Sequence, residues 1–135
     1  LLSRRQRQMC IRDRYYSGTA VYRTVFHWKD KPETTVYLNL GKVCNLATVR
    51  VNGVDCGTIW TAPYRTNITA ALKEGTNELE IEVTNTWANA LKGADEGKAP
   101  FDGIWTNAKY RRAENTLLPA GLLGPLNFEV ANKNK

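Results

Sequence analysis

Two groups of carboxylates are the residues best suited to acid–base chemistry, because a general acid and a general base must converge on one reacting bond. The first group, which alternates along one predicted strand, consists of Glu78, Glu80 and Glu82. Alternation places these side chains on a solvent face, so a solvated row that protects a sheet edge is favoured over a catalytic role. The second group, in a Gly-containing stretch, consists of Asp95, Glu96 and Asp102. It could line a sugar or calcium site, but a solvated loop is favoured. Neither group makes a convincing acid–base pair.

Nucleophilic, metal and cofactor chemistry have little support in the sequence. His27 is the single histidine and lies inside a predicted strand, and Ser17 is the one serine credible as a nucleophile. No Cys or His spacing fits a zinc site, and no phosphate-cradling glycine loop leads from a strand into a helix. We therefore expect no nucleophilic triad, no metal and no cofactor in this chain.

Cys44 and Cys56 are predicted to stay unpaired. A hairpin turn at Asn52-Gly53 would set Cys56 near Val49, which leaves Cys44 roughly 16 Å away along an extended strand. A disulfide needs Cα atoms within about 7 Å. Two small buried thiols are therefore the expected state.

Aromatic side chains are the remaining candidates for a binding site, because a flat apolar ring can stack on the C–H face of a sugar. The candidate rings are Trp60, Tyr64, Trp87 and Trp105. The polar neighbours that could hydrogen-bond sugar hydroxyls are Asn52, Arg65, Asn85 and Asn89. In a small β-domain such rings more often anchor the core or a loop. We expect Trp60 and Trp87 on the core side and Trp105, near Gly103, to be exposed.

Short segments rich in β-branched and aromatic residues, separated by Gly, Pro and Asn, predict an all-β chain. The predicted strands are Thr19–Trp28, Thr35–Leu40, Ala47–Asn52, Val54–Trp60, Glu78–Val83 and Leu126–Val130. The side chains predicted to face the core by alternation are Val36, Leu38, Leu40, Ala47, Val49, Val51, Leu79, Ile81 and Val83. Asn52-Gly53 predicts a hairpin turn.

Two further segments lack a strand pattern. Residues 67–73 predict a single helical turn, capped by Asn67 or Thr69 and ended by Gly75. Residues 85–125 carry several aromatic rings but no sustained period of 2 or 3.6. We predict that they form a long, aromatic-bearing loop region, and such regions are commonly functional.

Four segments, in this order, resemble the jelly-roll sugar-binding domain of glycoside hydrolases. They are GTAVYR from Gly18, ATVRVNG from Ala47, GTIWTAPYRTNIT from Gly57 and NELEIEVTN from Asn77. Further segments are similar to the C-terminal β-sandwich of glycoside hydrolase family 106, the α-L-rhamnosidases. These segments are the loop with Trp60, Pro63 and Tyr64, the stretch TNTWAN at Thr84–Asn89, and LLPAGLLGP at Leu117–Pro125. The resemblance covers residues 16–130.

The resemblance implies an antiparallel β-sandwich (jelly roll, galactose-binding-domain-like) without catalytic residues of its own. The catalytic module of the same full-length chain, with its acid and base carboxylates and its calcium requirement, would lie upstream and would be this domain's partner. Carbohydrate is a further implied ligand, and secretion or a periplasmic location is implied for the enzyme. A jelly roll has about eight strands and six are predicted, so we expect the sandwich to be incomplete at its N-terminal edge.

Two other interpretations stay open. An autonomous carbohydrate-binding module would show sugar affinity that depends on Trp105 or Tyr64. The similar jelly roll of β-galactosidases and β-mannosidases lies on the N-terminal side of the barrel, and the apparent chain end at Lys135 speaks against it.

Length and charge are consistent with one globular domain. The 135 residues are 42% hydrophobic and 24% charged, which is ordinary globular usage. The net charge is +6, but residues 1–14 carry five Arg and one Asp, which accounts for +4 of it. We therefore expect no nucleic-acid partner. The longest apolar stretch, Leu117–Leu126, is about half the length that crosses a bilayer, so no membrane span is expected.

The first 14 residues have a doubtful origin. QRQMCIRDR resembles a string that arises when sequencing-adapter DNA is read as protein. We predict a non-native segment at 1–14, a β-sandwich domain at 15–130 and a polar tail at 131–135. A real basic arm is the competing interpretation.

Overall fold

The computed structural model describes residues 15–97, 103 and 117–131. The chain divides into two compact units. The larger, which we call the sandwich unit, comprises Thr19–Thr84 and Ala120–Lys135. The smaller, which we call the helical unit, comprises Leu1–Gly18 and Asn85–Pro119. The predicted non-native segment at 1–14 lies outside the described residues.

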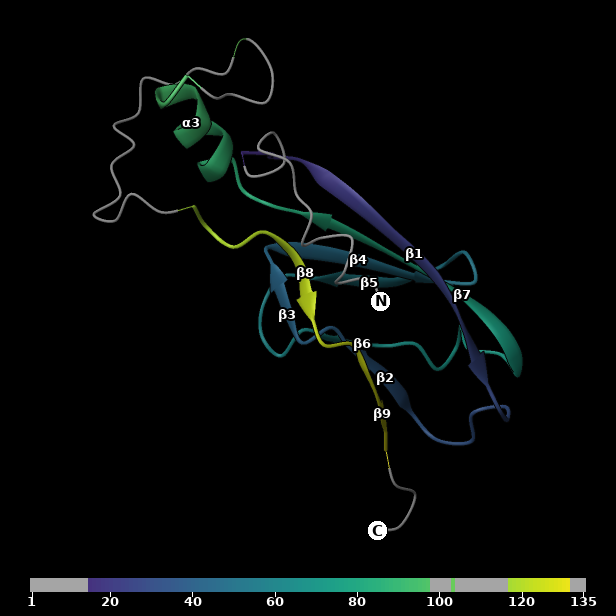
Figure 1. Cartoon of the computed structure of the whole chain (residues 1–135). Helices are drawn as coiled ribbons and strands as arrows, with labels where there is room; N and C mark the ends of the chain where they lie inside the picture. The colour runs from purple at the N-terminus through teal and green to yellow at the C-terminus, as the bar shows by residue number, and fades with distance from the viewer. Residues whose placement is uncertain (1–14, 98–102, 104–116, 132–135) are drawn as a thin grey trace. The chain divides into compact units, whose positions relative to one another are not determined.

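Four antiparallel strands form the first sheet of the sandwich unit, in the order β1-β7-β4-β5. Their bounds are Thr19–Trp28 (β1), Leu46–Val51 (β4), Val54–Ile59 (β5) and Gly75–Thr84 (β7). β1 and β7 are the longest strands and lie side by side (Figure 1), paired from Thr19 opposite Thr84 to Trp28 opposite Gly75. The bounds predicted for the first strand are confirmed to the residue.

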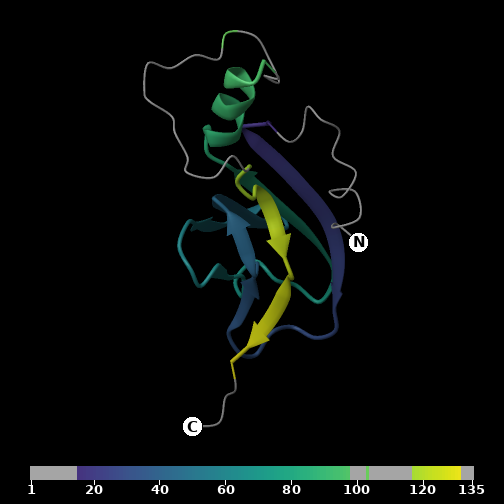
Figure 2. The same cartoon turned by 60° about the vertical axis from the view of Figure 1, so that its left-hand side comes forward.

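The second layer is built from short strands. Their bounds are Val36–Asn39 (β2), Lys42–Cys44 (β3), Arg65–Asn67 (β6), Gly121–Gly124 (β8) and Asn127–Val130 (β9). The order is β6-β2-β9 in one sheet, and β3 pairs with β8 in another. Figure 2 shows β8 and β9, in yellow, following one another along this layer. The sequence did not predict β3, β6 or β8, because β3 and β6 have only three residues, too few to show a period of 2, and β8 has glycine at both ends.

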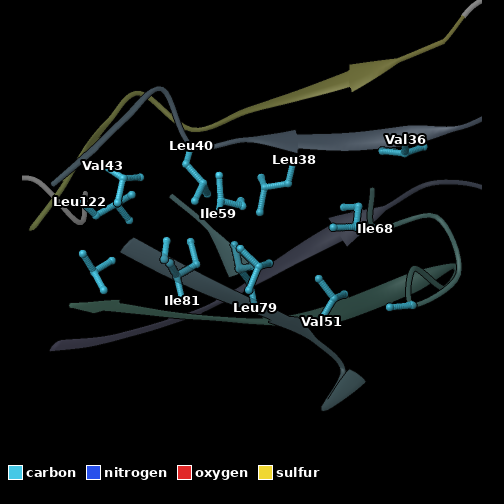
Figure 3. Packing of buried hydrophobic residues seen from close by; sticks show 14 of the residues in the cluster. Val36, Leu38, Leu40, Val43, Val51, Ile59, Ile68, Leu79, Ile81 and Leu122 are labelled. Carbon is cyan, nitrogen blue, oxygen red and sulfur yellow. The ribbon is translucent and has the colours of Figure 1, made fainter. Parts of the chain in front are cut away.

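The core lies between the two layers. The side chains that alternation in the sequence predicted to face inward are buried. Figure 3 shows Leu38 and Leu40 from the second layer pointing toward Leu79 and Ile81 from the first. All of these side chains are buried. Since fully burying one such side chain contributes about 1.5–3 kcal/mol, the inward face of each strand fixes its register. The prediction of an antiparallel β-sandwich is confirmed.

The glutamate row of β7 is not at a sheet edge, which corrects the edge-protecting interpretation. Glu78, Glu80 and Glu82 do face outward, opposite the buried side chains of the same strand. β7, however, lies between β1 and β4. The pairing of distant strands decided this, and alternation within one strand carries no information about its neighbours.

Two predicted turns are confirmed. Asn52 and Gly53 have φ of 52° and 77°, the left-handed conformation that a two-residue hairpin turn requires. Leu72 N–H donates to the Ile68 carbonyl at 3.0 Å, which closes one helical turn. The turn is capped at Asn67, whose Oδ1 accepts a hydrogen bond from Thr69 N–H at 3.0 Å.

Cys44 and Cys56 are free, as predicted, although both are only partly buried. The ladder between β4 and β5 shifts register between Thr48 and Arg50, so the simple pairing expected near Cys56 is interrupted there. Burial raises the pKa of the Cys56 thiol, which keeps it in the unreactive protonated form.

The sandwich unit has an open seam, which we define as Phe26, Trp28, Phe128 and Val130. The Phe128 ring centroid lies 4.9 Å from that of Phe26 and 5.2 Å from that of Trp28. Phe128 and Val130 nevertheless stay exposed. A groove of about 800 Å³, lined by Trp28, residues 29–34, Val36 and Val130, adjoins them.

The helical unit contains a helix that the sequence did not predict, α3 (Ala88–Asp95). Gly93 lies within it and would by itself weaken a helix by about 1 kcal/mol relative to Ala. A Cβ added at Gly93 would lie 2.8 Å from the Tyr15 ring, so glycine is required for close packing. The Tyr15 hydroxyl also donates to Glu96 Oε2 at 3.0 Å. Tertiary contact therefore outweighed local propensity. No helix among the described residues is long and apolar enough to cross a membrane.

Candidate functional site

The loop between β5 and β6 presents Trp60, which is 70% exposed. Its neighbour Ile59, at the end of β5, is buried, so Trp60 points to the opposite side as the strand ends. The prediction that Trp60 lies on the core side is therefore wrong. A tryptophan left so exposed marks a surface suited to contact with a ligand or another domain.

Tyr64 and Arg65 follow in the same loop and strand but lie differently. Tyr64 packs against the core, and its carbonyl accepts a hydrogen bond from Leu40 N–H at 2.7 Å. Arg65 begins β6 and is exposed. Of these three candidates, Trp60 and Arg65 are available to a ligand, whereas Tyr64 mainly anchors the loop.

Arg65 belongs to a polar network on the outer face of the β6-β2-β9 sheet, which we call the outer platform: Tyr37, Asn39, Arg65 and Glu129. Asn39 Nδ2 donates to Glu129 Oε1 at 2.8 Å, and Arg65 Nη1 donates to Glu129 Oε2 at 3.0 Å. The Arg65 guanidinium carbon lies 4.8 Å from the Tyr37 ring centroid, within the range of a cation–π contact. Hydrogen bonds from Asn39 and then Arg65 hold the pKa of Glu129 below its usual value, so this carboxylate stays ionised at neutral pH.

Sequence reasoning missed three members of the outer platform. The alternation that put Val36 and Leu38 inward also puts Tyr37 and Asn39 outward, so the signal was present. What could not be seen was that β9 would bring Glu129 beside them. Long-range strand pairing alone makes the network.

A second charged network lies on the outer face of the four-stranded sheet. Glu80 accepts from Arg23 Nε at 2.8 Å and from Arg50 Nη1 at 2.9 Å, and Glu82 accepts from Arg50 Nη1 at 2.7 Å. The hydrogen bond from Arg23, followed by that from Arg50, lowers the pKa of Glu80. A groove of about 600 Å³ adjoins these residues and includes Val25. Such a carboxylate is a poor general acid, since it holds no proton near neutral pH.

Asn52, another candidate for hydrogen bonds to sugar hydroxyls, uses its side-chain amide for bonds within the protein. Its Nδ2 donates to Asn77 Oδ1 and to the Ala71 carbonyl, both at 2.8 Å, and its Oδ1 accepts from Glu78 N–H at 2.9 Å. These bonds fix the hairpin turn against the neighbouring strand.

The helical unit holds the remaining described candidates. Asn85 Oδ1 accepts from Gly18 N–H, and its Nδ2 donates to the Tyr16 carbonyl, both at 2.8 Å. Asn89 is buried and bonds both the N–H and the carbonyl of Leu118. Both asparagines therefore tie chain segments together.

Trp87 corrects a second prediction, because it is 59% exposed and not on the core side. It is the residue immediately before the first residue of α3. Trp105 and Asp102 lie outside the described residues.

The two described carboxylates at the end of α3 have structural positions. Asp95 and Glu96 end α3 instead of lying in a loop, and Glu96 Oε1 lies 3.7 Å from Lys92 Nζ. In the part of the chain that the structure describes, no three His, Cys, Asp or Glu side chains gather as metal ligands would.

Residues 9–116 match the family described as the galactose-binding-like domain of glycosyl hydrolase 2. The match spans most of the chain, and the observed antiparallel sandwich agrees with it. This chain therefore belongs to that family of galactose-binding-like β-sandwich domains, and the predicted resemblance to a glycoside hydrolase sandwich is confirmed.

Three relatives illustrate the similarity. A rhamnosidase structure from Novosphingobium sp. PP1Y is 42% identical with a TM-score of 0.72, over 84% of this chain and 11% of the rhamnosidase. A protein named putative beta-glucuronidase from Formosa agariphila is 36% identical over 87% of this chain and 12% of its own length. The Ruminococcus gnavus beta-glucuronidase, 21% identical with a TM-score of 0.51 over 57% of this chain and 14% of that protein, shares the fold. The chain thus spans only about an eighth of these relatives.

Proposed function

We propose that this chain is a non-catalytic, ancillary β-sandwich domain of a longer glycoside hydrolase, of the α-L-rhamnosidase-like kind. It supports the catalytic module, and its Trp60 loop faces the carbohydrate that the enzyme binds. The 42% identity to a rhamnosidase, which is about nine times longer than the matched segment, is the observation that carries this proposal. The chemistry of such an enzyme would lie in the remainder.

The positions of the carboxylates support a non-catalytic role. Glycosidases place two carboxyl groups roughly 5 to 10 Å apart across the scissile bond, with one of them able to hold a proton. Here hydrogen bonds from Arg23 and Arg50 lower the pKa of Glu80, and hydrogen bonds from Asn39 and then Arg65 lower the pKa of Glu129. Asp55 Oδ1 accepts from Gly57 N–H at 2.7 Å within its own turn. These carboxylates already have structural partners.

The open seam supports packing against the remainder of the enzyme. Phe128 and Val130 are apolar side chains at the margin of the core that keep much of their surface exposed. Burying apolar surface contributes about 25 cal/mol per Å², so a neighbouring module that covers the seam would stabilise both partners.

An activity assay tests the proposal directly. The purified chain should release no detectable aryl alcohol from aryl α-L-rhamnosides or aryl β-D-glucuronides, alongside a complete rhamnosidase as the positive control. Turnover that is abolished by Glu→Gln substitution of a single carboxylate in this chain would overturn the non-catalytic assignment.

A second candidate function, an autonomous carbohydrate-binding module that acts through its loops, is favoured by the exposure of Trp60. It requires the isolated chain to bind a saccharide with an affinity that falls in Trp60→Ala or Trp105→Ala. Val54→Ala, at an exposed valine at the start of β5, is the matched control. Unchanged affinity in both tryptophan variants would exclude this candidate.

Two orders of modules are possible in the parent enzyme, and they differ in where this domain stands relative to the catalytic barrel. A galactose-binding-like sandwich of the β-galactosidase or β-mannosidase kind would precede its catalytic barrel, whereas the rhamnosidase-like arrangement places it after. The family match to glycosyl hydrolase 2 favours the first arrangement, and the 42% identity to a rhamnosidase favours the second. Sequencing the gene on both sides of this segment decides between them.

A further inference from the structure

We infer that the outer platform is a binding site for a neutral saccharide, with vicinal hydroxyls held by Arg65 and Glu129 and the ring lying beside Tyr37. This inference rests on the proposed function, since it places carbohydrate contact on a defined face of the ancillary domain. It adds this sheet face to the Trp60 loop as a second place of carbohydrate contact.

Strand register brings the platform residues onto one face. Tyr37 lies opposite Asn67 on β6 and Glu129 on β9. Asn39 lies opposite Arg65 and Asn127. Because alternate residues share a face, all six side chains point away from the buried Val36 and Leu38. Three strands spaced about 4.8 Å apart and two rows about 7 Å apart give an area suited to a mono- or disaccharide.

The hydrogen-bonding groups of the platform are planar, accessible and held in place. The side chains of Arg65 and Glu129 are 46% and 40% exposed. A guanidinium carries five N–H donors and a carboxylate accepts about four hydrogen bonds. Among the described residues, the 3.0 Å contact between them and the 2.8 Å bond from Asn39 use only part of this capacity. The remaining donors and acceptors lie side by side, as a pair of adjacent sugar hydroxyls requires.

The network also restrains these side chains before any ligand arrives. Tyr37 supports the Arg65 guanidinium from one side, and Asn39 orients the Glu129 carboxylate. Asn39 is itself held, because its Oδ1 accepts from Gly41 N–H at 2.8 Å. A preorganised site loses less side-chain entropy on binding, so modest contacts suffice for measurable affinity.

Charge selects the class of saccharide. Arg65 and Glu129 neutralise one another, so the platform offers no net charge to a ligand. A uronic acid would bring a carboxylate against Glu129 and would have to break its pair with Arg65. A neutral sugar such as a rhamnoside or galactoside can instead donate to Glu129 and accept from Arg65 while the pair stays intact.

The test is an NMR titration of the isotope-labelled chain with methyl α-L-rhamnoside, methyl β-D-galactoside and, separately, D-glucuronate. We expect amide shifts confined to β2, β6 and β9 with at least one neutral glycoside, and weaker binding of glucuronate. Arg65→Ala and Glu129→Gln should each weaken the neutral glycoside by roughly tenfold or more, the equivalent of one charge-assisted hydrogen bond. Thr48→Ala, on the outer face of the other sheet, is the matched control and should leave affinity unchanged.

The outcomes separate this inference from the proposed function. Absence of shifts with both neutral glycosides, tighter binding of glucuronate, or affinity that is lost in Trp60→Ala but kept in Arg65→Ala would each overturn the platform site. None of these results bears on whether the chain is non-catalytic, which the activity assay decides. An unchanged amide spectrum outside β2, β6 and β9 in each variant shows that the fold is retained, and Glu129→Gln preserves side-chain shape where Arg65→Ala does not.

Discussion

Phe128 in β9 lies directly opposite Leu38 in β2, and the two side chains point to the same side of their sheet. Leu38 is nevertheless 1% exposed and Phe128 39% exposed. The neighbouring inward-facing pair shows the same difference in exposure, since Val36 is buried whereas Val130 remains exposed. The apolar inner face therefore continues onto β9, beyond the part that the opposite sheet covers.

The open seam predicts self-association of the isolated chain. At high concentration, two copies should pair through the seam, because each would bury Phe128 and Val130 against the other. Val130→Lys should shift the chain toward monomer in sedimentation velocity. Val54→Lys, at a similarly exposed valine that begins β5, is the control and should have little effect. A parent chain that stays monomeric at all concentrations would contradict the prediction.

Asn77 should be the polar residue on which the sandwich depends most. It is 0% exposed, and its side chain bonds Lys73 N–H at 2.9 Å, the Lys73 carbonyl at 2.8 Å and Asn52 Nδ2 at 2.8 Å. Asn77→Ala would leave part-buried backbone groups of Lys73 and the Asn52 amide without this partner, and an unsatisfied buried group typically costs about 1–3 kcal/mol. We expect a loss of roughly 3 kcal/mol in the free energy of unfolding, measured by urea denaturation.

Asn67 provides the comparison for Asn77. Its side chain caps an exposed turn, where water can replace the lost hydrogen bond. Asn67→Ala should therefore cost only about 1 kcal/mol. Equal losses in the two variants would show that burial of the Asn77 network does not set its contribution.

Gly41 and Gly53 should respond differently to alanine, although φ is positive at both, +70° and +77°. A Cβ at Gly41 would lie 2.5 Å from the carbonyl carbon and oxygen of Gly124, whereas at Gly53 it would meet nothing within 4 Å. Gly53→Ala should cost only the left-handed conformation, about 1–2 kcal/mol. Gly41→Ala adds a backbone clash between β3 and β8 and should lower the melting temperature further. Thermal melts that show equal losses would argue against this close approach.

Stability should fall in acid because Glu80 is held ionised by Arg23 and Arg50. Its pKa in the folded chain lies below the ordinary value of 4.5. A group of this kind contributes fully above its unfolded pKa, and the contribution is lost as the pH falls through the folded pKa. The melting temperature should therefore decline from about pH 5 downward. Glu80→Gln should make the decline shallower in melts followed by circular dichroism, and an unchanged slope would contradict the role given to this ion pair.

Local patterns in the sequence determined the all-β class, most strand positions and the inward face of each long strand, whereas the sandwich was implied by the family resemblance. Alternation along Val36–Leu40 and Leu79–Val83 is a property of consecutive residues, so it can be read without knowing the partner strand. The Asn52-Gly53 turn is equally local, because the left-handed conformation of its two residues is a preference of those residue types.

Tertiary structure alone decided the features that depend on distant segments. α3 contains Gly93 because a larger side chain there would clash with the Tyr15 ring. The helix propensities of neighbouring residues do not reveal that contact. The exposure of Trp60 follows from where β5 ends, and the outer platform exists because β9 pairs with β2, some 90 residues away along the chain. Propensity and periodicity act over a few neighbours, whereas a binding surface on a sheet is made by strands that meet only after folding.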